Sequence, residues 1–463
     1  MTRKKVCVIG AGLGGLSTGL FLSKKGYAVT VFEKEELIGG RALSLNGNDL
    51  TLKDYKKILS KYSMAISFSE PPLKKIFKEK MLKDYRLDLG FHSIGGGEMS
   101  EAGRVVFETG SEINIIGTRL GLVRRNGYKF PLLNLIDKLI ILPQILRLYS
   151  YNEKTMKQLD TVSIADTIKK YDKKKLTFVL ELLPRVITTV NNLNKISTGE
   201  SFRANQLNIK RGSSPVGYPV GGLDTINNAL VQGIESNGGR ILLNHEVKEI
   251  IVEKGSVTGV KIKDKTFDSN LVIYNGLVQN LFQIVNEKNF SKKYVKYIKS
   301  LKGTGSLCAY YSLNNIPYEL TGKSFLFIEK NADVDGDDAV GMIEFVTADP
   351  KVEVAPKSAY LVQSYIICTP NEAKSKKMLT KLKKILDKNL DRLIPNYKNQ
   401  LNWAIYPTVW HLDGVAKTID NKKPDIKTPI EGLYLVGDCT KAPGIGINCA
   451  INSAKILCNE ILY

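Results

Sequence analysis

Short apolar runs and a glycine-rich turn alternate over the first forty residues of the chain. Residues 6–9 form an apolar run long enough for a buried strand, and residues 10–15 read Gly-Ala-Gly-Leu-Gly-Gly. The apolar side chains that follow recur at helical spacing until Lys24-Lys25-Gly26, a basic stretch with a glycine that is typical of a helix end. Residues 28–33 form a second apolar run. The pattern predicts a strand, a glycine turn, a helix and a second strand, which is the repeating unit of a parallel sheet.

Helical and alternating patterns follow one another along the rest of the chain. Residues 50–85 are predicted to be a Lys-rich helical insertion, and residues 99–200 are predicted to be mainly helical. Lys254-Gly255-Ser256 separates two strand patterns and predicts a hairpin. The other expected elements are helices at 223–236, 375–393 and 447–462 and strands at 241–244, 247–253, 257–263, 304–312, 324–328 and 433–436.

The N-terminal turn has the spacing of a dinucleotide-binding motif. Gly10 permits the tight turn, Gly12 lets the backbone approach a pyrophosphate, and Gly15 lets the helix pack closely on the strand. The N–H groups at the start of the following helix favour the negative phosphates. Glu33 ends the second strand about twenty residues further on, where a carboxylate accepts hydrogen bonds from ribose hydroxyls. These features together predict a dinucleotide site, although they do not separate FAD from NAD.

Three later motifs favour a flavin. Gly39-Gly40-Arg41 follows Glu33 and places an arginine where it can pair with a pyrophosphate. Near the other end of the chain, the strand in residues 432–438 ends in Asp438, and a carboxylate there can accept hydrogen bonds from polyol hydroxyls. Residues 444–448 then open the last helix, whose N–H groups would face and stabilise an anionic ring.

These motifs resemble those of one flavoenzyme family. Residues 6–41 resemble the N-terminus of the phytoene desaturase and amine oxidase superfamily, and residues 432–438 resemble its second flavin motif. Residues 87–97, 217–222 and 238–247 also resemble segments of phytoene-desaturase-like proteins. The resemblance implies non-covalent FAD held by Gly10, Gly12, Leu13, Gly14, Gly15, Glu33, Lys34, Gly40, Arg41, Val247, Gly437, Asp438, Gly446, Ile447 and Asn448.

The resemblance also implies the architecture. The expected fold class is α/β, a doubly wound Rossmann-like FAD-binding domain with an inserted α+β substrate domain. The FAD-binding domain is expected to consist of residues 1–97 (with the helical insertion at about 45–85), 215–298 and 404–463. The substrate domain is expected to consist of residues 98–214, mainly helical, and 299–403.

The expected activity is desaturation, saturation or isomerisation of an apolar, isoprenoid-type lipid by hydride transfer with flavin. Residues 438–444 differ from the C-terminal flavin segment of amine oxidases, and bacterial carotene desaturases lack the long insertion at 45–85. Two alternatives stay open. A flavin amine oxidase would carry an aromatic cage at the flavin, and a redox-silent FAD-fold protein associated with a membrane would bind FAD without being reduced.

No side chain is obligatory for catalysis, because hydride transfer to a flavin depends mainly on positioning. His92 lies in a glycine-rich segment and could tune the flavin or move a proton, or could simply be structural. Tyr218, Trp410 and His411 are the other weak catalytic candidates, and Trp410-His411 could form a wall of the pocket. The sequence motifs do not specify the substrate, the direction of reaction or the electron donor or acceptor.

The net charge of +21 is unusual for such a chain, since 67 Lys and Arg face 46 Asp and Glu. A positive surface favours nucleic acids, anionic lipids or acidic substrates, and a Lys-rich proteome would give the same excess. No nucleic-acid motif is present, so no nucleic-acid partner is expected. The six cysteines and three histidines lack metal-ligand spacing, and no structural metal is expected. No signal peptide or spanning segment is evident, so we expect a cytoplasmic protein, with the surface of an anionic membrane as a second location.

An unusually apolar helix is predicted at residues 132–148, with its few polar side chains on one side. Pro143 would kink this helix or divide it. The segment is too short and too charged to span a bilayer. It is expected either to be buried between the two domains or to dip into a membrane surface and admit a lipid-borne substrate.

Overall fold

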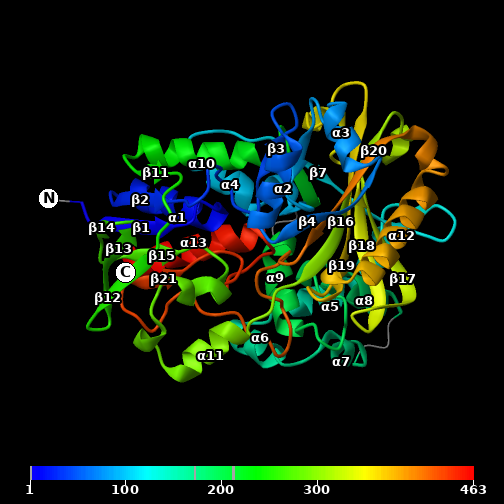
Figure 1. The fold of residues 1–463 in the computed structure, drawn as a ribbon. Helices are drawn as coiled ribbons and strands as arrows, with labels where there is room; N and C mark the ends of the chain where they lie inside the picture. Colours follow the sequence, from blue (N-terminus) through cyan, green and yellow to red (C-terminus); the bar gives the residue numbers. More distant parts are fainter. Residues whose placement is uncertain (1–2, 171–173, 211–213, 463) are drawn as a thin grey trace.

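The computed structural model describes residues 3–170, 174–210 and 214–462, and a parallel sheet joins segments from both ends of the chain (Figure 1). Each neighbouring pair in this five-stranded sheet is parallel. Its strands, in spatial order, are β11 (Arg240–Leu242), β2 (Ala28–Phe32), β1 (Lys5–Ile9), β15 (Val272–Tyr274) and β21 (Leu433–Leu435). The predicted Rossmann-like α/β fold is thereby confirmed.

Helix α1 (Leu13–Lys24) packs between the sheet and two other helices, α10 (Asp224–Ser236) and α13 (Ile447–Leu462). Nearly every residue of α1 is buried, polar ones included. Gly19 makes the contact with α10 close, because a Cβ at this position would lie 3.0 Å from the Ile234 side chain. The first and last helices of the chain therefore share one core and hold the glycine turn against the sheet.

A second, larger sheet lies beside the first (Figure 1). Six of the seven neighbouring pairs in this eight-stranded sheet are antiparallel, whereas β17 and β8 pair parallel. Its strands, in spatial order, are β4 (Met64–Glu70), β20 (Leu401–Val409), β16 (Gly305–Leu313), β19 (Tyr360–Cys368), β18 (Asp337–Glu344), β17 (Ser324–Val334), β8 (Leu120–Val123) and β9 (Tyr128–Lys129). Helix α12 (Lys376–Leu393) packs on β16 and β19 through its buried leucines.

Strand β4 corrects the prediction of an entirely helical insertion at residues 50–85. Helices α2 (Leu52–Lys61) and α3 (Leu73–Lys78) do form there, but the chain between them runs beside β20. Met64, Ile66 and Phe68 alternate with smaller residues, which suits a strand. The partner strand lies more than 300 residues away, so local pattern alone did not reveal this pairing.

Three small sheets complete the strand pairing of the described residues. β6 (Ile94–Gly96), β10 (Ser214–Pro219) and β7 (Ile115–Thr118) form one, β3 (Ser44–Asn46) and β5 (Arg86–Asp88) another, and β12 (Glu249–Glu253), β13 (Ser256–Ile262) and β14 (Lys265–Asp268) the third. Lys254 and Gly255, with φ of +50° and +85°, join β12 to β13. Two consecutive left-handed residues make the hairpin turn that matches strand twist, and the predicted hairpin is confirmed.

Five helices form a layer at the lower side of the view in Figure 1, and each of them contacts at least one other member. They are α5 (Leu135–Tyr149), α6 (Glu153–Leu159), α7 (Ile164–Ile168), α8 (Lys174–Thr188) and α9 (Thr198–Lys210). The region from 99 to 200 is thus largely helical as expected, but it also contains α4 (Glu101–Phe107) and the strands β7 to β9. Outside these regions, α11 (Lys292–Ser300) is the remaining α-helix among the described residues.

Helix α5 is neither divided at Pro143 nor buried between domains, as two of the expectations for residues 132–148 had it. The helix continues through Pro143 and is not divided there. It is not buried between domains either, since several of its apolar side chains are exposed. Within the described residues, no helix combines the length and the apolar character needed to cross a bilayer.

Candidate active site

A cavity of about 1250 Å³ lies at the carboxyl ends of the parallel strands. Small-molecule sites usually measure roughly 300–1,000 Å³, so this one has room for an extended ligand and a second molecule. Residues following β1, β2, β15 and β21 form one end, and β18, β19 and the helices α5, α8 and α9 contribute to the other. Ligands of open parallel sheets bind at this edge because the strand-to-helix turns converge there.

The glycine turn after β1 leaves bare backbone against the cavity. Gly10 has φ of +99°, which strongly favours glycine, and a Cβ on Gly15 would lie 2.1 Å from the Gly10 carbonyl oxygen. The first-turn N–H groups of α1 lack intrahelical partners, and Leu13 and Gly14 of this turn line the cavity. Gly446 and Ile447 place the start of α13 on the same cavity, and nothing lies within 4 Å of a Cβ built on Gly446. Two helix N-termini therefore favour negative charge here.

Glu33 lies at the end of β2 and is buried. Its carboxylate accepts hydrogen bonds from the Ala11 N–H (2.7 Å) and the Glu35 N–H (3.0 Å). Burial raises the pKa of Glu33, and the two N–H donors oppose that rise. The peptide N–H of His245 donates to the Glu33 carbonyl, which brings residues 245–247 to the same end of the cavity. This end of the cavity therefore has a carboxylate, that of Glu33, which can accept hydrogen bonds from ribose hydroxyls.

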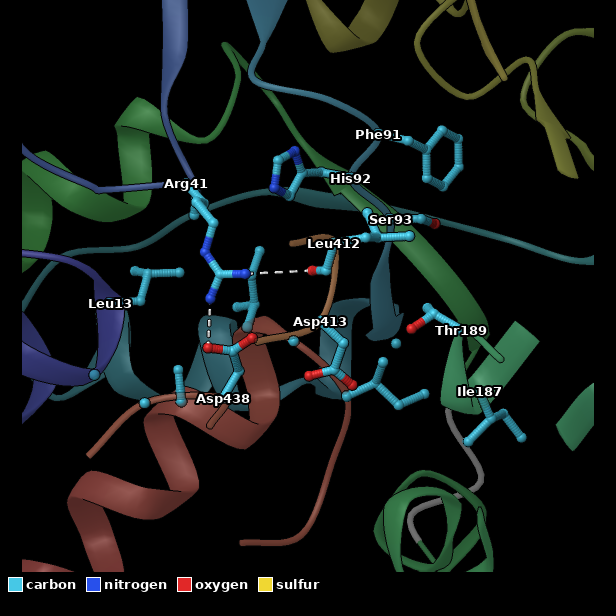
Figure 2. Close-up of a pocket in the computed structure, with 18 of the residues that line it drawn as sticks. Leu13, Arg41, Phe91, His92, Ser93, Ile187, Thr189, Leu412, Asp413 and Asp438 are labelled. Carbon is cyan, nitrogen blue, oxygen red and sulfur yellow. Dashed lines mark hydrogen bonds and ion pairs between the residues drawn. The ribbon is translucent and has the colours of Figure 1, made fainter. Parts of the chain in front are cut away.

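Arg41 and Asp438 meet in the lining of the cavity, as Figure 2 shows. The guanidinium lies 2.5 Å from Oδ1 of Asp438, and it also donates to the His411 carbonyl oxygen at 2.6 Å. The Gly414 N–H donates to the other carboxylate oxygen. Although burial opposes ionisation, Arg41 and Lys423 hold the pKa of Asp438 below its usual range.

Two buried lysines, Lys417 and Lys423, lie next to the Arg41–Asp438 pair, outside the lining of the cavity. The sequence analysis did not identify either of them. Each side chain is only 1% exposed. Lys417 pairs with Asp413, and Lys423 donates to the Asp438 carbonyl oxygen. With Arg41 the cluster holds three cations and two carboxylates, so a positive charge remains for an anionic ligand. No local signal distinguishes these lysines from the many surface lysines of the chain.

Phe91, His92 and Ser93 form the wall opposite Asp438 in Figure 2. Nδ1 of His92 is buried without a hydrogen-bond partner, and burial together with Arg41 lowers the His92 pKa to about 4. Ser93 donates a 3.0 Å hydrogen bond to Glu344, and burial raises the pKa of Glu344 to about 8. His92 and Ser93 are consequently polar but uncharged parts of this wall at neutral pH.

Most of the predicted cofactor residues line the cavity. They are Gly10, Gly12, Leu13, Gly14, Glu33, Lys34, Gly40, Arg41, Val247, Gly437, Asp438, Gly446 and Ile447. Gly15 and Asn448 lie behind this lining, where Gly15 shapes the turn and Asn448 donates to the Gly95 carbonyl oxygen.

Of the four weak catalytic candidates, only His92 lines the cavity. Tyr218 is fully buried and donates to Asp88 at 2.8 Å. Trp410 turns away at the end of β20 and donates to the Ala373 carbonyl oxygen, while His411 approaches the site only through its own carbonyl. The wall expected from Trp410-His411 is formed instead by the next two residues, Leu412 and Asp413.

Asn275 is a further site residue that the motifs did not include. It follows β15, lines the cavity and donates to the Gly10 carbonyl oxygen at 3.2 Å. A Cβ on Gly12 or Gly14 would lie within 3 Å of its side chain. A polar residue directly after a buried apolar strand was the available signal, because such positions lie at the ligand-binding edge.

Comparison with known proteins places this geometry in context. Residues 13–462 match the model of the family described as flavin-containing amine oxidoreductase. The chain is 26% identical over 293 residues to a 4,4'-diapophytoene desaturase (4,4'-diapolycopene-forming) of Methylomonas sp., covering 56% of this chain and 51% of that protein. The match therefore spans about half the length of that relative. A 1-hydroxycarotenoid 3,4-desaturase of Flavobacterium sp. is 24% identical over 506 residues, with 99% of both chains covered.

A solved structure shares the fold over its whole length. An oxidoreductase from Methanosarcina mazei superposes with a TM-score of 0.72 at 22% identity, covering 98% of this chain and all of the other.

Proposed function

The chain belongs to the family of flavin-containing amine oxidoreductases, and from this premise we propose that it uses FAD to desaturate, saturate or isomerise an apolar, isoprenoid-type lipid. The observation that carries the proposal is the division of one cavity into two chemically different halves. One half is built from glycine backbone, charges and helix N-termini, and the other from aliphatic side chains.

The residues of the polar half fit FAD, the cofactor of this family. The bare turn at Gly10–Gly14 and the helix N-terminus suit a pyrophosphate, and Glu33 has the carboxylate that suits a ribose. Asp438 and the start of α13 continue the polar lining beyond Arg41. The cluster of Arg41, two buried lysines and two carboxylates keeps a positive charge that complements the negative charge of a dinucleotide.

The other half of the cavity suits an apolar substrate. Burying an apolar molecule releases about 25 cal/mol per Å² of surface removed from water, which favours a hydrocarbon over a polar ligand in such a lining. The aliphatic lining comes from α5, α8 and the loop before α5. It consists of Leu132, Leu133, Ile141, Leu142, Ile145, Val179, Leu180, Leu183, Val186 and Ile187.

The side chains at the junction of the two halves would position the substrate rather than react with it. FAD, when bound, supplies the two-electron chemistry of the reaction. The Phe91 and Tyr365 rings line the cavity and add an apolar aromatic surface, with the two ring planes inclined by 30°. Neutral His92 and Ser93 add polar contacts without placing a charge against a hydrocarbon. Holding the reacting carbon in place and excluding water are the contributions that this lining can make.

The relatives support a substrate that reacts at a carbon–carbon bond, since two of them are named as carotenoid-type desaturases. The amine oxidase alternative gains less support from the lining. Phe91 and Tyr365 have ring centroids 4.4 Å apart, so they contact each other and leave no slot for an amine between them.

The decisive experiment is mass spectrometry of lipids that co-purify with the protein, followed by anaerobic reaction with candidate substrates. We expect a yellow protein that releases FAD on denaturation and carries an isoprenoid or polyene lipid. That lipid class should reduce the oxidised flavin in a desaturation and reoxidise chemically reduced flavin in a saturation, whereas an isomerisation should change the lipid without a net change in the flavin. Bleaching by aliphatic amines alone would support an amine oxidase, and a flavin that no donor reduces would support a redox-silent binding protein. A colourless protein that gains no flavin absorbance after incubation with FAD would exclude the proposal.

Replacing Glu33 with alanine should weaken FAD binding by about 1–3 kcal/mol, the cost of losing a charged hydrogen bond. The measurement is titration of apoprotein with FAD, followed by quenching of flavin fluorescence. Glu36→Ala is the matched control, because Glu36 is exposed and three residues away. Glu33→Gln keeps an acceptor for the Ala11 N–H and should be intermediate. Equal affinity in Glu33→Ala and Glu36→Ala would show that Glu33 is not a ligand of the cofactor.

A further inference from the structure

Helix α5 exposes most of the large apolar side chains found on the described surface. Of ten exposed large hydrophobic residues among the described side chains, six belong to α5. They are Leu135, Ile136, Leu139, Ile140, Leu142 and Leu146, with exposed fractions from 41% to 73%. Single exposed apolar residues are ordinary, but six on one helix indicate a surface that meets something apolar.

The exposed residues form a stripe that adjoins the cavity. Leu135, Leu139, Leu142 and Leu146 are spaced by three or four positions and share one face of the helix. The neighbouring face lines the cavity through Lys138, Ile141, Leu142 and Ile145. Leu142 belongs to both sets, being 44% exposed and part of the lining. The outer stripe and the apolar half of the cavity are therefore continuous along one helix.

Exposed cations accompany the stripe on α5. The acidic residue of α5, Asp137, is buried and paired with Lys129 and Lys175. Lys138 and Arg147 are exposed on the helix itself. An apolar stripe with cations at its margins is the pattern of a helix that lies in the headgroup region of an anionic bilayer.

We infer that α5 docks the protein on an anionic phospholipid surface and forms the rim through which a lipid substrate enters the cavity. This deepens the proposed function and rests on it for the nature of the substrate. Charge favours a membrane over a second copy of the chain, because two such faces would bring like charges together. The stripe would sit among the acyl chains while Lys138 and Arg147 reach phosphate groups. A hydrocarbon leaving the bilayer beside Leu142 would then pass into the aliphatic lining without crossing water.

The test is flotation of the flavin-loaded protein with vesicles of phosphatidylcholine and phosphatidylglycerol. The wild type should float at low salt, and 0.5 M NaCl or pure phosphatidylcholine should reduce the floated fraction at least tenfold. Leu139→Asp should have the same effect at low salt, because Leu139 is exposed and does not line the cavity. Phe107→Asp is the matched control, since Phe107 is also an exposed apolar residue, 72% against 59% for Leu139, and lies on a different helix, α4. It should float like the wild type.

Each variant is first checked for bound FAD, so a misfolded protein is recognised before flotation. A wild type that stays in the dense fraction at low salt, or a Leu139→Asp protein that floats as well as Phe107→Asp, would overturn the inference. A wild-type dimer in sedimentation that Leu139→Asp dissociates would assign the stripe to self-association instead. Flotation does not depend on turnover, so failure of the docking inference and failure of the proposed function can be told apart.

Discussion

Replacing Arg41 with methionine is expected to abolish stable FAD binding and to lower the free energy of unfolding by about 3 kcal/mol. Arg41 is the closest cation to the buried Asp438 carboxylate, and removing one partner of a buried pair leaves a charge without its main compensation. The Gly414 N–H and Lys423 still contact Asp438, which keeps the loss moderate. The measurements are flavin absorbance after desalting and the urea midpoint of the apoprotein.

A double variant separates the two roles of Arg41. Arg41→Met combined with Asp438→Asn removes both charges, so most of the lost stability should return while FAD binding should not. Arg104→Met, at an exposed position on α4, controls for the loss of an arginine. If Arg41→Met retains flavin through desalting as well as Arg104→Met does, Arg41 has no part in holding the cofactor.

Replacing Glu344 with glutamine is expected to flatten the decline of stability between pH 5 and pH 8. Burial raises the pKa of Glu344 from its ordinary 4.5 to about 8. Between these values the unfolded chain is ionised and the folded protein stays protonated, so unfolding releases a proton and stability falls as pH rises. The slope is about 1.4 kcal/mol per pH unit, and the accumulated difference from the glutamine variant is on the order of 3 kcal/mol. Urea unfolding at a series of pH values measures it.

Other buried acids determine how much the stability of the Glu344→Gln variant still depends on pH. Asp88, whose pKa burial raises to about 7, lies close enough to Glu344 to raise its pKa further, and it contributes a slope of the same sign. Asp438, with a pKa below its usual range, adds no slope above pH 5. Glu253→Gln, on the exposed end of β12, should follow the wild type. Parallel curves for Glu344→Gln and the wild type would mean that Glu344 is ionised in the folded protein.

The parts of the site that could be predicted from the sequence depend on local backbone geometry. A tight turn between a strand and a helix requires glycine where φ is positive or where another chain segment is too close for a Cβ, as at Gly10 and Gly15. The carboxylates Glu33 and Asp438 follow buried strands, and parallel strands bring their carboxyl ends to one edge. Such requirements leave a spacing that can be recognised without knowing the rest of the fold. The doubly wound sheet and the polar end of the cavity followed from them.

What the sequence did not determine depends on contacts between distant segments. Strand β4 exists because β20 lies beside it, and Lys417 and Lys423 are buried because Asp413 and Asp438 are nearby to compensate their charge. The apolar pattern of α5 is the same whether the helix is covered or exposed, since periodicity states which side chains share a face and not what lies against that face. Only the packing of α5 on α8 and α9 decided that its leucine stripe faces outward.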